Sequence, residues 1–140
     1  MRQIEPHPLW IGHAGDGRDI PVIFDNGIRA VVQLAVEEPP IQPPHELIFC
    51  RFPLLDGIGN DPVLLRLAIH AVETLQRNRI RTLVCCGGGM SRAPAIAAAA
   101  LSAVGWKQAE KCLKVVAEFC PADVSPGLWK DIRSALEDDE

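Results

Sequence analysis

The residues best suited to covalent chemistry stand together at positions 85–92, where the chain reads CCGGGMSR. A cysteine thiolate is a strong nucleophile, and the planar guanidinium of an arginine holds two oxygens of a tetrahedral oxyanion. The three glycines between Cys86 and Arg92 let the backbone curl, so that several N–H groups point toward one anion. This spacing predicts a site in which Cys86 attacks a bound phosphate that Arg92 holds.

The flanking segments place this loop between a strand and a helix. The apolar run 82–86 is typical of a buried strand, and Pro94 fits the first turn of a helix that continues to about Val104. A helix N-terminus adds positive potential, which stabilises both an anion and a nearby thiolate. The expected phosphate-binding residues are therefore Gly87, Gly88, Gly89, Met90, Ser91 and Arg92.

Other interpretations of the glycine-rich turn fit less well. A nucleotide-binding loop of the form GxxxxGK[ST] needs a lysine, which is absent here, and a dinucleotide site needs wider glycine spacing. A cysteine that ends a strand is, by itself, more often part of the core than a catalyst. A sulfurtransferase also carries a cysteine loop at such a turn, but that interpretation predicts neither the acidic residue Asp56 nor the C-terminal helices.

The rest of the chain alternates short β-rich runs with helical patterns. This alternation predicts an α/β fold with a central, mostly parallel twisted sheet of about four to five strands flanked by helices. The expected strands cover residues 9–11, 30–35, 47–53 and 82–86, and the expected further helices cover 19–26, 62–75, 107–119 and 126–136. A length of 140 residues suits one domain, 1–140.

Two loops and one helix lie between the expected strands. The segment EEPPIQPPHE at 37–46 has four prolines, which predicts a stiff surface loop, and 54–60 is a loop that carries Asp56. Asp61 fits the N-cap of the following helix, with Pro62 as its first residue. The helix is expected to bury one face, formed by Leu64, Leu67, Ala68, Ala71, Val72 and Leu75.

Composition and charge limit the classes of function. The net charge of −4 argues against a nucleic-acid partner, and no apolar run reaches the ~20 residues that cross a bilayer. The N-terminus lacks the apolar centre of a secretory signal, and the five cysteines show no disulfide spacing, which together predict a cytoplasmic protein. Because no CxxC pair exists and no histidine neighbours a cysteine, no metal site is expected.

The loop CGGGMSR resembles the Cys-x5-Arg loop of the cysteine-dependent protein tyrosine phosphatases, and of their dual-specificity branch in particular. Four other segments are similar to that family in the same order: IEPHPLWIG, DNGIRAVVQLA, CRFPLLDG and VSPGLW. The resemblance covers nearly the whole chain, and the loop is its most specific part. It implies hydrolysis of phosphomonoesters (phosphotyrosine, and also phosphoserine or phosphothreonine) through a phosphocysteine on Cys86, without a metal or an organic cofactor.

The resemblance also implies a carboxylic acid that protonates the leaving oxygen and later deprotonates the attacking water. Asp56 is the candidate, because it lies 30 residues before Cys86 on a glycine-containing loop that follows a strand. The alternative interpretation of Asp56 is a turn aspartate. Asp61 is the competing acid, but its position as an N-cap explains it better.

Two positions depart from the pattern of the family. Cys85 stands where the family usually has a histidine that orders the loop, and Ala93 stands where it usually has a hydroxyl that stabilises the leaving thiolate. Slow turnover is therefore expected, and a phosphate-binding pseudophosphatase is the alternative function. The expected partner is a phosphorylated protein or a small phosphomonoester, and the protein is expected to be a monomer.

Overall fold

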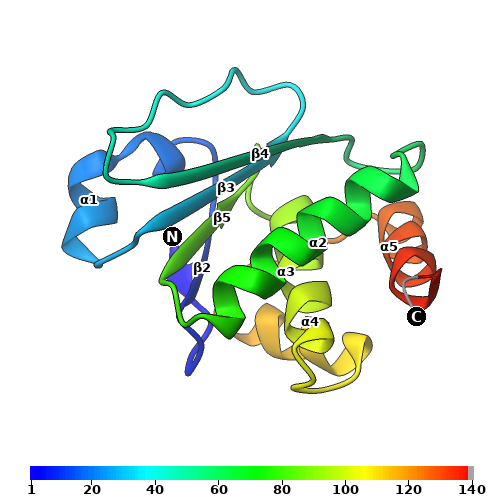
Figure 1. Cartoon of the computed structure of the whole chain (residues 1–140). Coiled ribbons are helices and arrows are strands. Elements are labelled where there is room, and N and C mark those ends of the chain that lie inside the picture. Colours follow the sequence, from blue (N-terminus) through cyan, green and yellow to red (C-terminus); the bar gives the residue numbers. More distant parts are fainter. Residues whose placement is uncertain (139–140) are drawn as a thin grey trace.

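The computed structural model describes residues 1–138, in which five strands form one sheet of order β1-β2-β5-β3-β4 (Figure 1). The strands are β1 Arg2–Gln3, β2 Leu9–Gly12, β3 Ala30–Ala35, β4 Ile48–Leu54 and β5 Thr82–Cys85. β1 runs antiparallel to β2, and all other neighbours are parallel. The predicted α/β fold with a mostly parallel sheet is confirmed, with β1 as an addition that is too short to show a sequence pattern.

The helices lie on both faces of this sheet (Figure 1). The turn η1 (Asp16–Arg18) and helix α1 (Ile20–Asp25) pack on one face. The other face is covered by the longer helices α2 (Pro62–Arg77), α3 (Arg92–Ala103), α4 (Ala109–Phe119) and α5 (Pro126–Asp138). None of the helices within residues 1–138 is long and apolar enough to cross a membrane.

The interior strand β3 is buried along its whole length, because helices or loops cover both of its faces. Its one polar side chain, Gln33, has partners for both ends of its amide. The amide nitrogen donates to the Pro39 carbonyl at 2.9 Å, and the amide oxygen accepts from the Ile41 N–H at 3.2 Å. These bonds attach the proline-containing loop after β3 to the sheet.

Helix α3 is the central helix of the larger layer, and every residue from Arg92 to Leu101 is buried. Most of these residues are alanines, whose small side chains let the neighbouring helices approach closely. The N-terminus of α3 is consequently held by packing on several sides, and the loop that precedes it is attached to a rigid element.

The buried face of α2 differs in part from the predicted one. Leu67 is 53% exposed, whereas Leu65 and Ile69, which the predicted face omits, belong to the core. The buried residues of α2 are Leu65, Ala68, Ile69, Val72, Leu75 and Gln76. The error arises because leucines at several adjacent positions make two neighbouring faces of this helix apolar, and only packing against the sheet selects one.

The parallel strands bring four chemically useful segments to one edge of the sheet. The carboxyl ends of β2, β3, β4 and β5 lie together there. The segments that leave these strands carry His13, Glu37, Asp56 and Cys86, in that order. This edge is where open α/β sheets usually bind their ligands.

Candidate active site

The two adjacent cysteines lie on opposite sides of the sheet. Cys86 belongs to the core cluster beneath α2 to α5, and Cys85 belongs to the cluster beneath α1. Burial, with a smaller contribution from the neighbouring Cys86, raises the pKa of Cys85 to about 12. Cys85 therefore remains a protonated thiol at neutral pH, and only Cys86 is placed to act in the loop.

Gly89 and Gly87 of the loop must be glycine for different structural reasons. Gly89 has φ +75°, and a Cβ at this position would lie 2.8 Å from the backbone oxygen of Gly12. A Cβ at Gly87 would lie 2.9 Å from Glu37 Oε2 and 3.2 Å from Arg92 Nη2. Gly89 thus allows the loop to pack on the end of β2, and Gly87 leaves room for an ion pair.

The backbone N–H groups of the loop are available to a ligand. In the described part of the chain, none of the N–H groups of residues 87–91 donates a hydrogen bond to another group. The loop is held instead by the Cys86 N–H, which donates to the Gly12 carbonyl at 3.4 Å, and by the Gly87 carbonyl, which accepts from Ala14 at 3.1 Å. Free N–H groups that converge before a helix N-terminus are suited to binding an anion.

The guanidinium of Arg92 is buried and is oriented by three acceptor atoms, which belong to Glu37 and Leu54. Nη1 donates to Glu37 Oε1 at 2.6 Å and to the Leu54 carbonyl at 3.0 Å, and Nη2 donates to Glu37 Oε2 at 2.5 Å. Nε is buried and has no hydrogen-bond partner among the residues that the structure describes. The edge formed by Nε and the second hydrogen of Nη2 is therefore free to hold two oxygens of an anion.

Glu37 and Arg92 stabilise the charged forms of one another. The hydrogen bond from Arg92 lowers the pKa of Glu37 from 4.5 to about 2, and the hydrogen bond from Glu37 raises the pKa of Arg92. Because the pKa of Glu37 is lower in the folded state, the ion pair contributes its full stabilisation of the folded protein above about pH 4.5. This stabilisation is lost as the pH falls toward 2, where Glu37 becomes protonated.

Asp56 joins three segments that are distant in the sequence. Its Oδ1 accepts hydrogen bonds from the hydroxyls of Ser91 at 2.6 Å and Ser125 at 2.7 Å, and the Ser125 N–H donates to Ser91 Oγ at 3.0 Å. Asn60 holds the loop that carries Asp56, because its side chain exchanges two hydrogen bonds with the backbone of Leu55. Oδ2 of Asp56 accepts no bond from any residue in the range 1–138 and is available for proton transfer.

A small cavity of about 190 Å³ brings the predicted catalytic residues together. It is lined by Asp56, Cys86, Gly88, Met90, Ser91, Arg92 and Asp123. The volume is below the ~300–1,000 Å³ of sites that enclose a whole small molecule, so it suits one tetrahedral group. Gly87 and Gly89, also predicted to bind phosphate through their amides, do not line the cavity but shape the loop.

Three residues of the site were not predicted: Glu37, Ser125 and Asp123. Asp123 is exposed at the cavity, and its N–H donates to the Met90 carbonyl at 2.7 Å. Asp61, the competing acid, is an N-cap as expected, since its carboxylate accepts from the Val63 N–H at 2.9 Å. Within residues 1–138, no group of three or more His, Cys, Asp or Glu side chains is arranged to hold a metal ion.

Comparison with known proteins identifies the fold. The structure of human DUSP28 superposes with a TM-score of 0.86 at 23% identity, over 99% of this chain and 96% of that one. A mouse protein complexed with zinc tungstate superposes with a TM-score of 0.85 at 22% identity, over 98% of this chain and 86% of that one. Human tyrosine phosphatase-like serine/threonine/tyrosine-interacting protein superposes with a TM-score of 0.78 at 17% identity, over 96% of this chain and 93% of that one.

No protein-family model and no curated protein sequence matches the chain. The structural likeness extends over nearly the whole chain and includes human DUSP28 and DUSP15. The chain therefore has the fold of the dual-specificity phosphatases, as the resemblance of its sequence predicts.

Proposed function

We propose that this protein is a cysteine-dependent phosphatase that hydrolyses phosphomonoesters. The observation that carries the proposal is the set of groups around one small cavity: the Cys86 thiol, the free edge of the Arg92 guanidinium and the loop residues Gly88, Met90 and Ser91, whose N–H groups are unpaired among the described residues. A nucleophile that shares its cavity with donors for a tetrahedral dianion is suited to phosphoryl transfer. The mouse protein of similar fold was solved with tungstate, which is also a tetrahedral oxyanion.

In the first step, the thiolate of Cys86 attacks phosphorus and the bond from phosphorus to the alcohol oxygen breaks. Arg92 and the loop amides hold the three equatorial oxygens as charge develops on them. Asp56 donates a proton to the leaving oxygen, so that the product is a neutral alcohol. In the second step, Asp56 removes a proton from water, the water oxygen attacks phosphorus, and the sulfur–phosphorus bond breaks to release inorganic phosphate.

The second step is the slower one in this proposal. Ala93 and Cys85 are both buried, and neither supplies the hydroxyl or the imidazole that the resembling family usually has at these positions. The nearby hydroxyl of Ser91 donates to Asp56, so it is occupied by another acceptor. The phosphocysteine is then expected to accumulate. The alternative function is a phosphate-binding pseudophosphatase, which binds the group and does not turn over.

Rapid mixing with p-nitrophenyl phosphate tests the function. We expect a burst of about one p-nitrophenol per protein, because formation of the phosphocysteine precedes a slower hydrolysis. Stopped-flow absorbance measures the burst, and acid quench followed by mass spectrometry locates the phosphoryl group. Binding of tungstate without a burst supports the pseudophosphatase, whereas fast turnover without a burst contradicts the slow second step.

A pair of acid variants tests the role of Asp56. With phenyl phosphate, whose leaving group needs protonation, Asp56→Asn is expected to lower kcat by about 10²-fold. The loss should be smaller with p-nitrophenyl phosphate, whose leaving group is a stable anion. Asp123→Asn is the matched control, because Asp123 lines the same cavity but makes no bond to Ser91 or Ser125. If Asp123→Asn shows the leaving-group dependence and Asp56→Asn does not, the assignment is wrong.

The proposed substrates follow from the size of the cavity. A cavity of about 190 Å³, with Met90 46% exposed among its lining residues, takes the phosphate and leaves the rest of the substrate outside. It admits phosphoserine and phosphothreonine as well as phosphotyrosine, on a protein or on a small molecule. We also propose that the protein acts as a monomer in the cytoplasm, where its five free cysteines stay reduced.

A further inference from the structure

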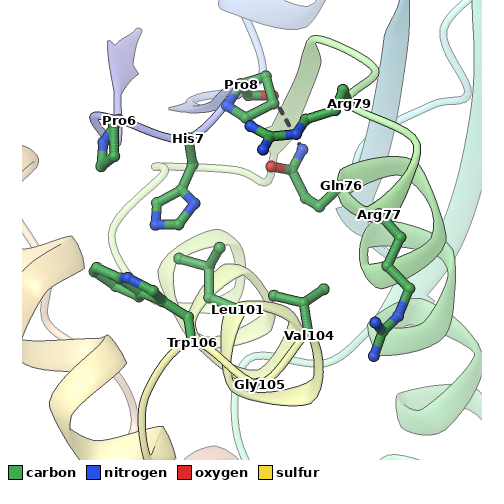
Figure 2. A pocket seen from close by; sticks show the side chains of 10 residues that line it. All are labelled: Pro6, His7, Pro8, Gln76, Arg77, Arg79, Leu101, Val104, Gly105 and Trp106. Atoms are coloured by element: carbon green, nitrogen blue, oxygen red, sulfur yellow. Dashed lines mark hydrogen bonds between the residues drawn. The ribbon is translucent and has the colours of Figure 1, made fainter.

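A second cavity, of about 580 Å³, has His7, Gln76 and Trp106 among its lining residues (Figure 2). It lies at the opposite end of the sheet from Cys86. Strands β2 and β5 begin beside it, at the paired residues Leu9 and Thr82. Helices α2 and α3 end beside it, so that its walls come from the C-terminal turns of these helices and from residues 6–8. Its volume falls within the ~300–1,000 Å³ typical of small-molecule sites.

The charges at this cavity are positive, although the chain as a whole is acidic. Two of the lining residues are arginines, and no Asp or Glu lines the cavity in the part of the chain that the structure describes. Arg77 is already paired with Glu73 at 2.8 Å and donates to the Ala103 carbonyl at 2.9 Å. Arg79 makes no such bond with another residue of 1–138, so its charge is available to a ligand.

The inner part of the cavity combines an apolar wall with polar atoms that have no partner. Leu101 and Trp106 form the wall, and the ring of His7 meets that of Trp106 edge to face at 4.4 Å (Figure 2). His7 Nε2 and Gln76 Oε1 are buried without a hydrogen bond among the described residues. Burial, and then the charge of Arg79, lower the pKa of His7, so its ring is neutral at pH 7.

Arg79 occupies a backbone position that favours glycine. Its φ is +57°, and it follows the last turn of α2, where the Arg79 and Ile80 N–H groups bond to the carbonyls of Gln76 and Leu75. This arrangement is the Schellman motif, in which glycine is the usual residue at the left-handed position. The chain therefore has an arginine at the edge of the cavity where backbone geometry alone would select glycine.

We propose that this cavity binds a small organic anion with a planar apolar body, the anionic group pairing with Arg79 and the body lying against Leu101 and Trp106. The ligand class is an aromatic carboxylate or phosphate, and its binding does not depend on the phosphatase proposal. Because α3 runs from the Cys86 loop to this cavity, one buried helix connects the two sites.

Titration with indole-3-carboxylate tests the proposal, and two-dimensional ¹H–¹⁵N NMR detects the binding. The chemical shift of the Trp106 indole N–H is expected to change until it saturates. The indole N–H shifts of Trp10 and Trp129 should change less. Arg79→Gly should weaken binding by about tenfold or more, because one charged contact is lost. Its thermal midpoint should equal or exceed that of the natural chain, since glycine suits φ +57°.

Two controls make the result specific. Arg29→Ala also removes one positive charge, at an exposed position that does not line the cavity, and should leave the affinity within about twofold. The uncharged indole-3-carboxamide should bind at least about tenfold more weakly than the acid. The proposal is overturned if the Trp106 signal does not saturate at millimolar ligand, if Arg79→Gly binds as tightly as the natural chain, or if acid and amide bind equally.

Discussion

Cys86→Ser is expected to lower kcat for p-nitrophenyl phosphate by about 10⁴-fold or more, which removes measurable turnover. A serine hydroxyl is not ionised at neutral pH, so the group that attacks phosphorus is lost while the shape of the cavity is kept. Steady-state release of p-nitrophenol measures the effect. Mass spectrometry of the quenched protein should show the phosphoryl adduct on Cys86 of the natural chain and none on the variant.

The neighbouring cysteine provides the matched control. Cys85→Ala removes a thiol one residue away, on the other side of the sheet, whose pKa of about 12 keeps it protonated. This variant should keep kcat within about threefold, with some loss of thermal stability because a buried side chain becomes smaller. Equal losses of kcat in both variants, or a phosphoryl group on Cys85, would falsify the assignment of the nucleophile.

Arg92→Lys is expected to lower kcat/KM by about 10³-fold, although the positive charge is kept. An ammonium cannot donate two parallel hydrogen bonds to the Glu37 carboxylate and also present two parallel donors to phosphate, whereas the guanidinium can do both. Inhibition by inorganic phosphate should weaken in parallel, which isothermal titration of the same variant measures directly. A lysine variant with nearly natural kcat/KM would show that the second donor of the guanidinium is not needed.

Glu37→Gln should give a smaller loss, of about tenfold in kcat/KM, because Arg92 stays charged but is oriented less firmly. The loss should be constant from about pH 4.5 upward, since Glu37 has a pKa of about 2 and is ionised throughout this range. A pH profile of both proteins measures this. If the ratio of kcat/KM between the natural chain and the variant changes between pH 5 and 8, Glu37 itself titrates in that range.

The sequence predicts the parts of the site that are local in the chain. The strand, glycine loop and helix of 82–104 form as expected, and they bring Cys86 and Arg92 into one cavity. Asp56 reaches the same cavity from a loop that Asn60 fixes. These residues carry strong local signals, namely glycines, a helix start and an acidic residue after a strand.

The partners that hold these groups could not be predicted from local patterns. Glu37 lies 55 residues before Arg92, in a segment whose prolines indicate only a surface loop. Ser125 and Asp123 lie beyond two further helices. The segment VSPGLW, which contains Ser125, resembles the phosphatase family, but its residue types do not indicate contact with the loop. Such contacts depend on which strands are parallel and on their order, and these features emerge only when the whole chain is packed.

The two serines on Asp56 have a consequence for which substitutions the site can tolerate. One carboxylate oxygen satisfies the hydroxyls of Ser91 and Ser125, and the Ser91 oxygen in turn satisfies the N–H of Ser125. A mutation that removes the carboxylate therefore leaves two hydroxyls without their acceptor, beyond its effect on catalysis. The three positions are therefore coupled in their effect on stability, and asparagine at position 56, whose amide oxygen can still accept these hydrogen bonds, is expected to preserve the shape of the site better than alanine.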